Sequence, residues 1–215
     1  LVNILAHDLR SPLNHIQSLS QLLENSNSNR SDDEKDFLDK ISESASRMNH
    51  MISKILDVDT LDRDQNTVLK EHVDVHQLLQ DLSIRYQPLA TNKNIELVVK
   101  AHDESLQLET DHMLLFLVLE NLLSNAVKFS DPGSKVELAV SKDEDQLIFE
   151  VSDQGPGFTD EDKKMLFTRF KKLSAQPTGG ESSTGLGLSI VKKYVSDLGG
   201  EVWLETEAGK GSTFF

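Results

Sequence analysis

The sequence predicts an α+β protein built from two parts. Residues 1–66 are expected to form an α-helical hairpin that becomes a four-helix bundle in a dimer. Residues 67–215 are expected to form an α/β sandwich with a mixed sheet. Two observations predict this division: aliphatic residues recur at heptad spacing in the first part, and strand-like and helix-like segments alternate in the second.

Two heptad stripes support the hairpin. The polar segment 25–33 separates them, and Ser31 and Glu34 have the spacing of a capping box that starts the second helix. One hairpin cannot bury both stripes well, so we predict a homodimer in which two hairpins pair. A monomeric hairpin packed on the rest of the chain remains the alternative. The stripes consist of Val2, Leu5, Leu9, Pro12, Ile16, Leu19 and Leu23, and of Phe37, Ile41, Ser44, Met48, Met51, Ile55 and Val58.

The charged segment 62–72 lacks a stripe and is expected to be a linker. The segments that follow indicate a sheet covered by helices on one face. Asp111 is the expected N-cap of one helix, Lys142–Asp145 the turn of a hairpin, and Gly199 the end of the last helix. We expect strands at HVDV, IELVVK, KVELAVS, QLIFEVS, EVWLETE and GSTFF, and helices at 75–93, 111–130 and 186–200.

Composition excludes several classes of protein. The net charge is −14 and no basic patch compensates for it, so we expect no nucleic-acid partner. The absence of cysteine excludes disulfides, zinc–thiolate sites and cysteine nucleophiles. No apolar run approaches the ~18 residues of a transmembrane helix, and no signal peptide is visible.

The two ends of the chain both fall inside expected elements. Leu1 lies in a helical pattern, and Phe214 and Phe215 lie in a strand pattern. We therefore expect a fragment of a longer protein. A connection to the membrane is expected only through a missing N-terminal sensor or membrane segment.

The stretch AHDLRSPLN, residues 6–14, places a histidine where it can react. In the heptad, His7 lies opposite the apolar seam, with Asp8 beside it and Ser11 on the same face. Pro12 clashes with the carbonyl of Asp8 and should bend the helix just beyond His7. Neutral imidazole is a nucleophile, and a neighbouring carboxylate can accept its second proton.

This stretch resembles the H-box of bacterial two-component sensor histidine kinases. Asp8 and Ser11 stand where glutamate and threonine are commoner. The resemblance implies that His7 is the phospho-accepting residue and Asp8 its general base. It also implies that Ser11 positions the water that removes phosphate from the partner.

Residues 120–130, ENLLSNAVKFS, resemble the N-box of the same family. Asn121 and Asn125 are spaced i, i+4 and share one helix face. Amide oxygens can ligate Mg²⁺, which prefers oxygen ligands. Lys128 can neutralise phosphate, and Phe129 can cover the adenine of ATP. A merely polar helix face would also explain the two asparagines.

Three further segments resemble the remaining boxes in order. SDQGPGF resembles the G1 box, in which Asp153 accepts a hydrogen bond from the adenine amino group while Gly155 and Gly157 allow close backbone approach. Polar residues 174–184 suit a lid over nucleotide. LFTRFKKL resembles the F-box and TGLGLSIV the G2 box, where a helix N-terminus binds phosphate; the residues implied are Phe167, Arg169, Phe170, Thr184, Gly185, Leu186 and Gly187.

Together these resemblances imply an ATP-dependent protein-histidine kinase. ATP and Mg²⁺ are the implied cofactors, with Asn121 and Asn125 at the metal. The phosphoryl group passes from His7 to an aspartate of a response regulator receiver domain, and a phosphatase activity accompanies the kinase. The core is expected in the cytoplasm, with the full-length protein anchored in the inner membrane if the missing segment spans it.

Two other functions remain open from the sequence. The sandwich also occurs in the ATPases of gyrase, heat-shock chaperones and mismatch repair, which share the asparagine helix and the D-x-G-x-G turn. Only the H-box hairpin ahead of the sandwich separates the kinase from them. The third hypothesis is a scaffold that dimerises and binds nucleotide without transferring phosphate.

Overall fold

The computed structural model describes residues 16, 38, 41, 68–100, 106–144, 146–181, 183 and 185–215. The chain divides into two units, Leu1–Gln65 and Asn66–Phe215. Nearly all of the first unit lies outside the described residues, and so do the predicted cap at Ser31 and most of both heptad stripes.

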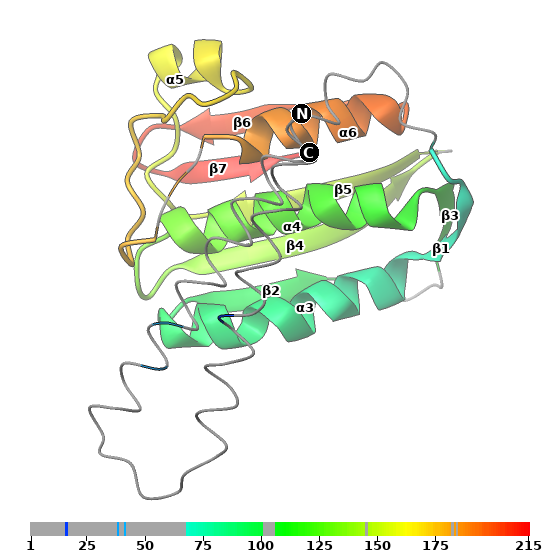
Figure 1. Ribbon diagram of the computed structural model, residues 1–215, viewed down its shortest axis with the longest axis horizontal. Coiled ribbons are helices and arrows are strands. Elements are labelled where there is room, and N and C mark those ends of the chain that lie inside the picture. Colours follow the sequence, from blue (N-terminus) through cyan, green and yellow to red (C-terminus); the bar gives the residue numbers. More distant parts are fainter. Residues whose placement is uncertain are drawn as a thin grey trace, which may run out of the picture. The chain divides into compact units, whose positions relative to one another are not determined.

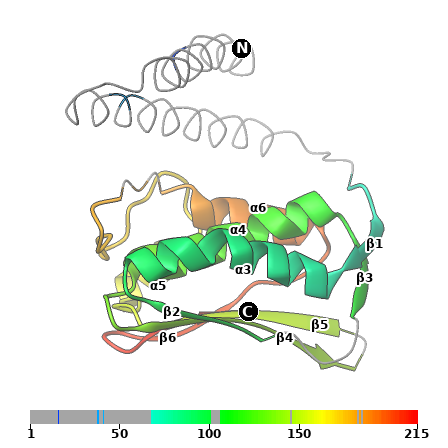
Figure 2. The same ribbon diagram turned by 90° about the horizontal axis from the view of Figure 1, so that it is seen from below.

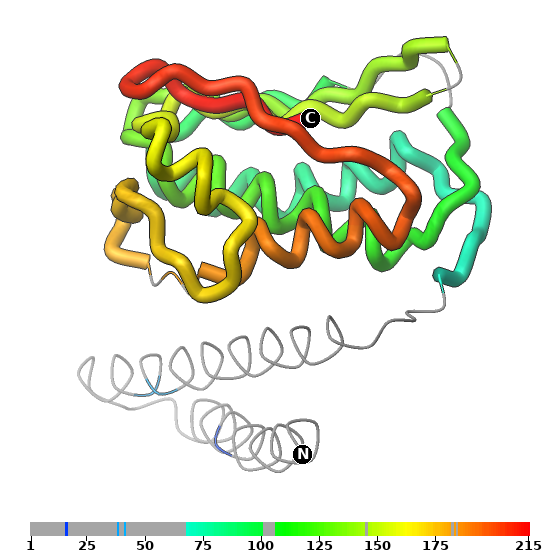
Figure 3. The backbone as a smooth tube through the Cα atoms, turned by 90° about the horizontal axis from the view of Figure 1, so that it is seen from above, coloured from blue at the N-terminus to red at the C-terminus, as the bar shows by residue number. Residues whose placement is uncertain are grey.

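The second unit is a two-layer sandwich of one mixed sheet and three long helices. The five-stranded sheet has the order β2-β4-β5-β7-β6, in which β2 and β4 are parallel and the other neighbours are antiparallel. Figures 2 and 3 show the helices α3, α4 and α6 lying together over one face of this sheet. The predicted fold class is confirmed, with the sheet covered on one face as expected.

The strands and helices follow in the order expected, with two additions. The bounds are β1 Glu71–Asp74, α3 Val75–Asn92, β2 Glu96–Lys100, β3 Gln107–Thr110, α4 His112–Phe129, β4 Lys135–Asp143, β5 Gln146–Asp153, α5 Asp160–Met165, α6 Gly187–Asp197, β6 Leu204–Glu207 and β7 Gly211–Phe214. Strand β3, which pairs with β1, and helix α5 were not predicted from the sequence. The expected linker 62–72 overlaps the first two residues of β1.

Helix α4 is the centre of the helical layer. It runs beside α3 and α6 (Figure 1), and its apolar residues pack inward because they recur on one side of the helix. By length and composition α4 could also span a membrane, which the sequence analysis did not expect of any segment. Its buried residues mark it as a core helix: Leu115, Val118, Leu119, Leu122, Leu123, Ala126 and Val127.

Asp111 begins α4, as predicted. One carboxylate oxygen accepts the N–H of Leu114 at 3.0 Å, and the other accepts the N–H of Leu69 at 3.0 Å. The residue is 9% exposed. Asp111 therefore both caps the central helix and ties the segment before β1 to it.

We expect Asp111→Ala to lower the free energy of unfolding by about 2 kcal/mol, because it removes an N-cap and also the second hydrogen bond, from the N–H of Leu69. The matched control is Asp74→Ala at the N-cap of α3, where an exposed carboxylate accepts, among the described residues, the N–H of Gln77 alone. That variant should lose about 1 kcal/mol. Urea unfolding measures both, and an equal loss in the two variants would contradict the double role of Asp111.

Candidate functional site

The two asparagines of α4 face the start of α6. A methyl group on Gly187, the first residue of α6, would lie 3.1 Å from Oδ1 of Asn121 and 3.7 Å from Nδ2 of Asn125. The amide nitrogen of Asn121 donates to the carbonyl of Leu117 at 2.8 Å. Its oxygen therefore remains available as an acceptor or a metal ligand beside Gly187.

The N-terminus of α6 is suited to bind an anion. Among the described residues no side chain caps it, so its first N–H groups carry the partial positive charge of an uncapped helix start. Leu186 is 2% exposed and anchors the helix start in the core. The first N–H groups of α6 thus lie near the side-chain amides of Asn121 and Asn125, with Gly187 between them. This arrangement fits phosphate.

Lys128 and Phe129 lie on the last turn of α4. The Lys128 ammonium is 5.5 Å from the centre of the Phe129 ring. Both residues are half-buried. The charge and the ring therefore lie next to each other on the helix end where α6 begins (Figure 1).

Asp153 is the last residue of β5 and joins the end of α4 through the turn that follows. Its Oδ1 accepts the N–H of Gly155 at 2.8 Å. A methyl group on Gly155 would lie 2.9 Å from that oxygen and 3.1 Å from the carbonyl of Phe129, so a side chain there would crowd both groups. Gly157 has φ +66°, and a methyl group there would lie 2.4 Å from the carbonyl of Glu207.

Burial raises the pKa of Asp153 to about 6, although hydrogen bonds from the N–H groups of Gly155 and Ser212 oppose the rise. A carboxylate held in this environment has a strong tendency to accept another hydrogen bond. The described structure therefore supplies an acceptor beside Phe129.

The predicted F-box residues are spread over a turn between α5 and the lid segment. Phe167 is half-buried, and the Lys192 ammonium of α6 lies 5.0 Å from its ring centre. Arg169 and Phe170 are exposed, Phe170 by 65% and with φ +60°. Gly185 contacts the backbone of this turn, where a methyl group would lie 2.6 Å from the carbonyl of Lys171.

The structure thus brings part of the predicted set together. Asn121 and Asn125 meet Gly187, and Gly155 lies against both the Phe129 carbonyl and the Asp153 carboxylate, whereas Arg169 and Phe170 are exposed. Four predicted site residues lie outside the described residues: His7, Asp8, Ser11 and Thr184.

Asp162 is a buried acid that the sequence analysis missed. It is 7% exposed and closes a capping box with Thr159 at the start of α5. Ser174, the first residue of the lid segment, donates its N–H to Asp162 Oδ1 at 2.9 Å and its hydroxyl to Oδ2 at 2.5 Å. Burial would raise the pKa of Asp162, but these bonds and those from Thr159 hold it below its usual range. The T-x-x-D spacing at 159–162 is the local signal that was available.

The described residues fit a metal ion that is held mainly by a bound small molecule and less by protein side chains. Within the described ranges no three histidine or acidic side chains gather into a metal site. The amide oxygens of α4 are the candidate protein ligands, and Mg²⁺ commonly takes one or two protein ligands together with phosphates and waters. The arrangement is consistent with Mg²⁺ that arrives on a nucleotide.

Two family descriptions match the chain. Residues 110–215 match the histidine kinase-, DNA gyrase B-, and HSP90-like ATPase family. Residues 1–64 match the His Kinase A (phospho-acceptor) domain. The ATPase match includes α4, Asp153 and α6, and the phospho-acceptor match includes the stretch AHDLRSPLN.

Curated relatives match nearly the whole chain but are much longer. The autoinducer 2 sensor kinase/phosphatase LuxQ of Vibrio parahaemolyticus is 30% identical over 98% of this chain and 25% of its own length. The sensor protein GacS of Pseudomonas syringae is 34% identical over 98% of this chain and 24% of its own length. The chain therefore spans about a quarter of the length of these relatives.

Solved structures share the fold. ShkA in complex with AMPPNP has a TM-score of 0.81 and 28% identity over 99% of this chain and 44% of its own. ThkA in complex with the response regulator TrrA has a TM-score of 0.64 and 21% identity over 99% of this chain and 58% of its own, which supports the fold alone.

The pKa of Asp153 leads to a prediction about stability. Its folded-state pKa, about 6, exceeds the ordinary 3.8, so the folded state binds the proton more tightly than the unfolded state. The free-energy penalty for burying the ionised carboxylate is therefore absent below pH 3.8. It grows as the pH rises to 6 and reaches its full size above pH 6. Asp153→Asn keeps an acceptor for Gly155 and removes the charge.

We expect Asp153→Asn to raise the free energy of unfolding by about 2 kcal/mol at pH 7.5 and to leave it nearly unchanged at pH 4. Thermal unfolding of both proteins at the two pH values measures the difference. The account of Asp153 is wrong if the variant is equally or less stable at pH 7.5.

Proposed function

Because the chain belongs to the histidine kinase family, we propose that it is the core of a sensor histidine kinase, which phosphorylates His7 with ATP and passes the phosphoryl group to an aspartate of a response regulator. The order of the two family matches carries this proposal. A phospho-acceptor domain that contains His7 precedes an ATP-binding domain. We assign residues 1–66 to the first and 67–215 to the second.

ATP is proposed to bind between the end of α4, the turn after β5 and the start of α6. Asp153 would accept a hydrogen bond from the adenine amino group, beside the Phe129 ring. Lys128 and the N–H groups at Gly185, Leu186 and Gly187 would meet the phosphates. Gly155 and Gly157 keep the turn close, and Phe167, Arg169, Phe170 and Thr184 complete the proposed set.

Asn121 and Asn125 are proposed to hold Mg²⁺ through their amide oxygens. Bound there, Mg²⁺ would offset the charge of the phosphates. The position of Gly187 against both amides supports this assignment, because the phosphates at the start of α6 would then lie beside the metal.

The transfer itself requires little covalent chemistry from the protein. One imidazole nitrogen of His7 attacks the γ-phosphorus, the bond to the β-phosphate oxygen breaks, and ADP leaves. Asp8 accepts the proton from the other ring nitrogen. Positioning and charge stabilisation supply most of the catalysis. Ser11 is proposed to orient the water that dephosphorylates the regulator in the accompanying phosphatase reaction.

We propose a homodimer formed through residues 1–66. Of the predicted seam residues, the structure describes Ile16 and Ile41, which are 40% and 45% exposed in the single chain. Pairing two hairpins would bury both side chains. The response regulator would dock near His7, no nucleic acid is involved, and the core is proposed to act in the cytoplasm, with any membrane anchor N-terminal to it.

The decisive experiment is phosphorylation with labelled ATP. We expect the protein to acquire phosphate that is labile in acid and stable in base, and His7→Gln to acquire none. His15→Gln, a substitution in the same predicted helix, is the matched control and should be labelled as the parent protein is.

Label that survives in His7→Gln would exclude His7 as the acceptor. Net ATP hydrolysis without a phosphorylated protein would instead favour an ATPase of the gyrase or chaperone type.

A further inference from the structure

Lys93 lies in the turn between α3 and β2, outside every motif described above. Its backbone N–H donates to the carbonyl of Ala90 at 3.1 Å and ends α3, and Asn94 follows with φ +56°. Gly133, in the turn after α4, donates its N–H to the Asn94 carbonyl at 2.7 Å. The backbone of Lys93 is therefore held at the end of α3, and the next residue, Asn94, joins its turn to the turn after α4.

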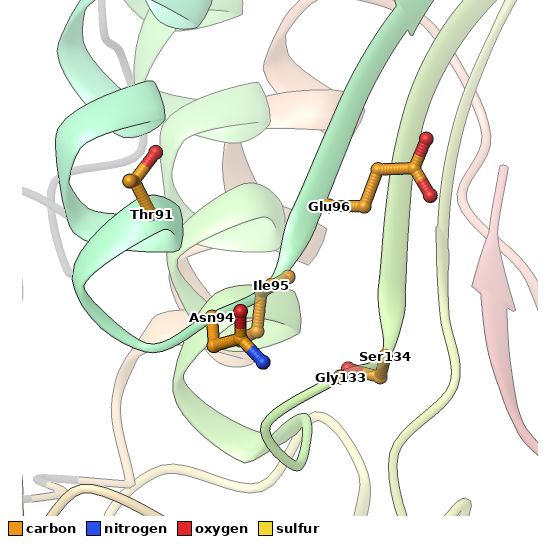
Figure 4. A pocket seen from close by; sticks show the side chains of 6 residues that line it. All are labelled: Thr91, Asn94, Ile95, Glu96, Gly133 and Ser134. Carbon is orange, nitrogen blue, oxygen red and sulfur yellow. The ribbon is translucent and has the colours of Figure 1, made fainter.

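Figure 4 shows a pocket between the same two turns, which are joined again by the N–H of Glu96 and the carbonyl of Ser134. Its lining contains one acid and no base, so it does not suit phosphate. The lining residues are Thr91, Asn94, Ile95, Glu96, Gly133 and Ser134. The pocket marks the place where the two turns meet and is not itself part of the proposed nucleotide site.

The Lys93 side chain extends to the end of α4. Its ammonium donates to the carbonyls of Val127 and Lys128, both at 2.9 Å, and to Glu181 Oε1 at 3.1 Å. The side chain is 16% exposed. An ammonium has three donors, so these three acceptors satisfy it fully.

The two carbonyls are among those that an α-helix leaves without an intrahelical partner. The C-cap residue of α4 is Ser130, which has φ −80°, and no glycine follows it directly to close the helix end. Lys93 therefore supplies the cap from another element. A cation at a helix C-terminus is also favoured by the helix dipole.

The lid segment binds the same helix end. Thr178 donates its N–H to the Lys128 carbonyl at 3.1 Å and its hydroxyl to the Ser130 carbonyl at 2.7 Å. Glu181 accepts Lys93 and also the N–H of Gly179 at 2.9 Å. One ammonium thus joins the last turn of α4 to the segment that begins at Thr178.

We propose that Lys93 is a positioning residue for nucleotide binding, which orders the turn that carries Lys128 and Phe129 and holds residues 178–181 against it. The inference deepens the proposed ATP site and rests on it. Segments that are ordered before a ligand arrives lose less entropy when it binds. Removing the ammonium should therefore weaken ATP binding, although it removes none of the proposed contacts with ATP.

The first test uses hydrogen exchange in the nucleotide-free protein, so that it does not depend on kinase activity. In Lys93→Met we expect amides of the last turn of α4 and of residues 174–181 to exchange about tenfold faster, because charge-assisted bonds are lost. In Glu181→Gln only the lid segment should exchange faster, since the bonds from Lys93 to the carbonyls of Val127 and Lys128 remain.

The matched control is Lys100→Met, which removes an ion pair with Glu137 on β2 and β4 and leaves α4 untouched. It should change exchange in neither segment. If Lys93→Met behaves like this control, Lys93 positions nothing and the inference is wrong. Glu181 is exposed at the surface, so Glu181→Gln tests the contact between Lys93 and the lid segment even if Lys93→Met fails to fold.

The second test is ATP affinity, measured by calorimetry. We expect about a tenfold higher Kd in Lys93→Met, a smaller rise in Glu181→Gln, and no change in Lys100→Met. Faster exchange together with an unchanged Kd would overturn the role in binding. A parent protein that binds no ATP would refute the proposed function itself, and the exchange experiment would still decide whether Lys93 orders the two segments.

Discussion

The carbonyl groups at the C-terminal end of α4 impose the constraint on which the rest of this structure depends. They point away from the helix, no glycine closes the turn, and they lie against other elements where unpaired acceptors are costly. Lys93 and Thr178 donate to them from two distant segments. The two segments are thereby held beside Lys128 and Phe129, the residues that we assign to phosphate and adenine.

The packing of the helices on one face of the sheet explains why the remaining groups gather at this end. Helix α4 ends where β5 ends and α6 begins (Figure 1). Gly155 allows the turn after Asp153 to approach the carbonyl of Phe129, and Gly187 allows α6 to approach Asn121. Small residues at two contacts thus bring together a carboxylate, two amides and an uncapped helix start.

The sequence predicted those elements that carry local signals. The helix-like segments of the sequence identified α3, α4 and α6, the Asp111 cap marked where α4 begins, and the polar turn at Lys142–Asp145 identified the hairpin of β4 and β5. Strand β3 is short and depends on pairing with β1, which no local pattern shows. Lys93 could not be found, because a lysine that caps a helix 34 residues away leaves no mark in its own segment.

The central claim is that the end of α4 and the turn after β5 form one ATP site. A crystal structure with Mg²⁺ and a non-hydrolysable ATP analogue tests it most directly. The account predicts the adenine amino nitrogen within about 3.2 Å of the Asp153 carboxylate, and Mg²⁺ about 2.1 Å from an amide oxygen of Asn121 or Asn125. An analogue that binds elsewhere, or with its adenine away from Asp153, would contradict it.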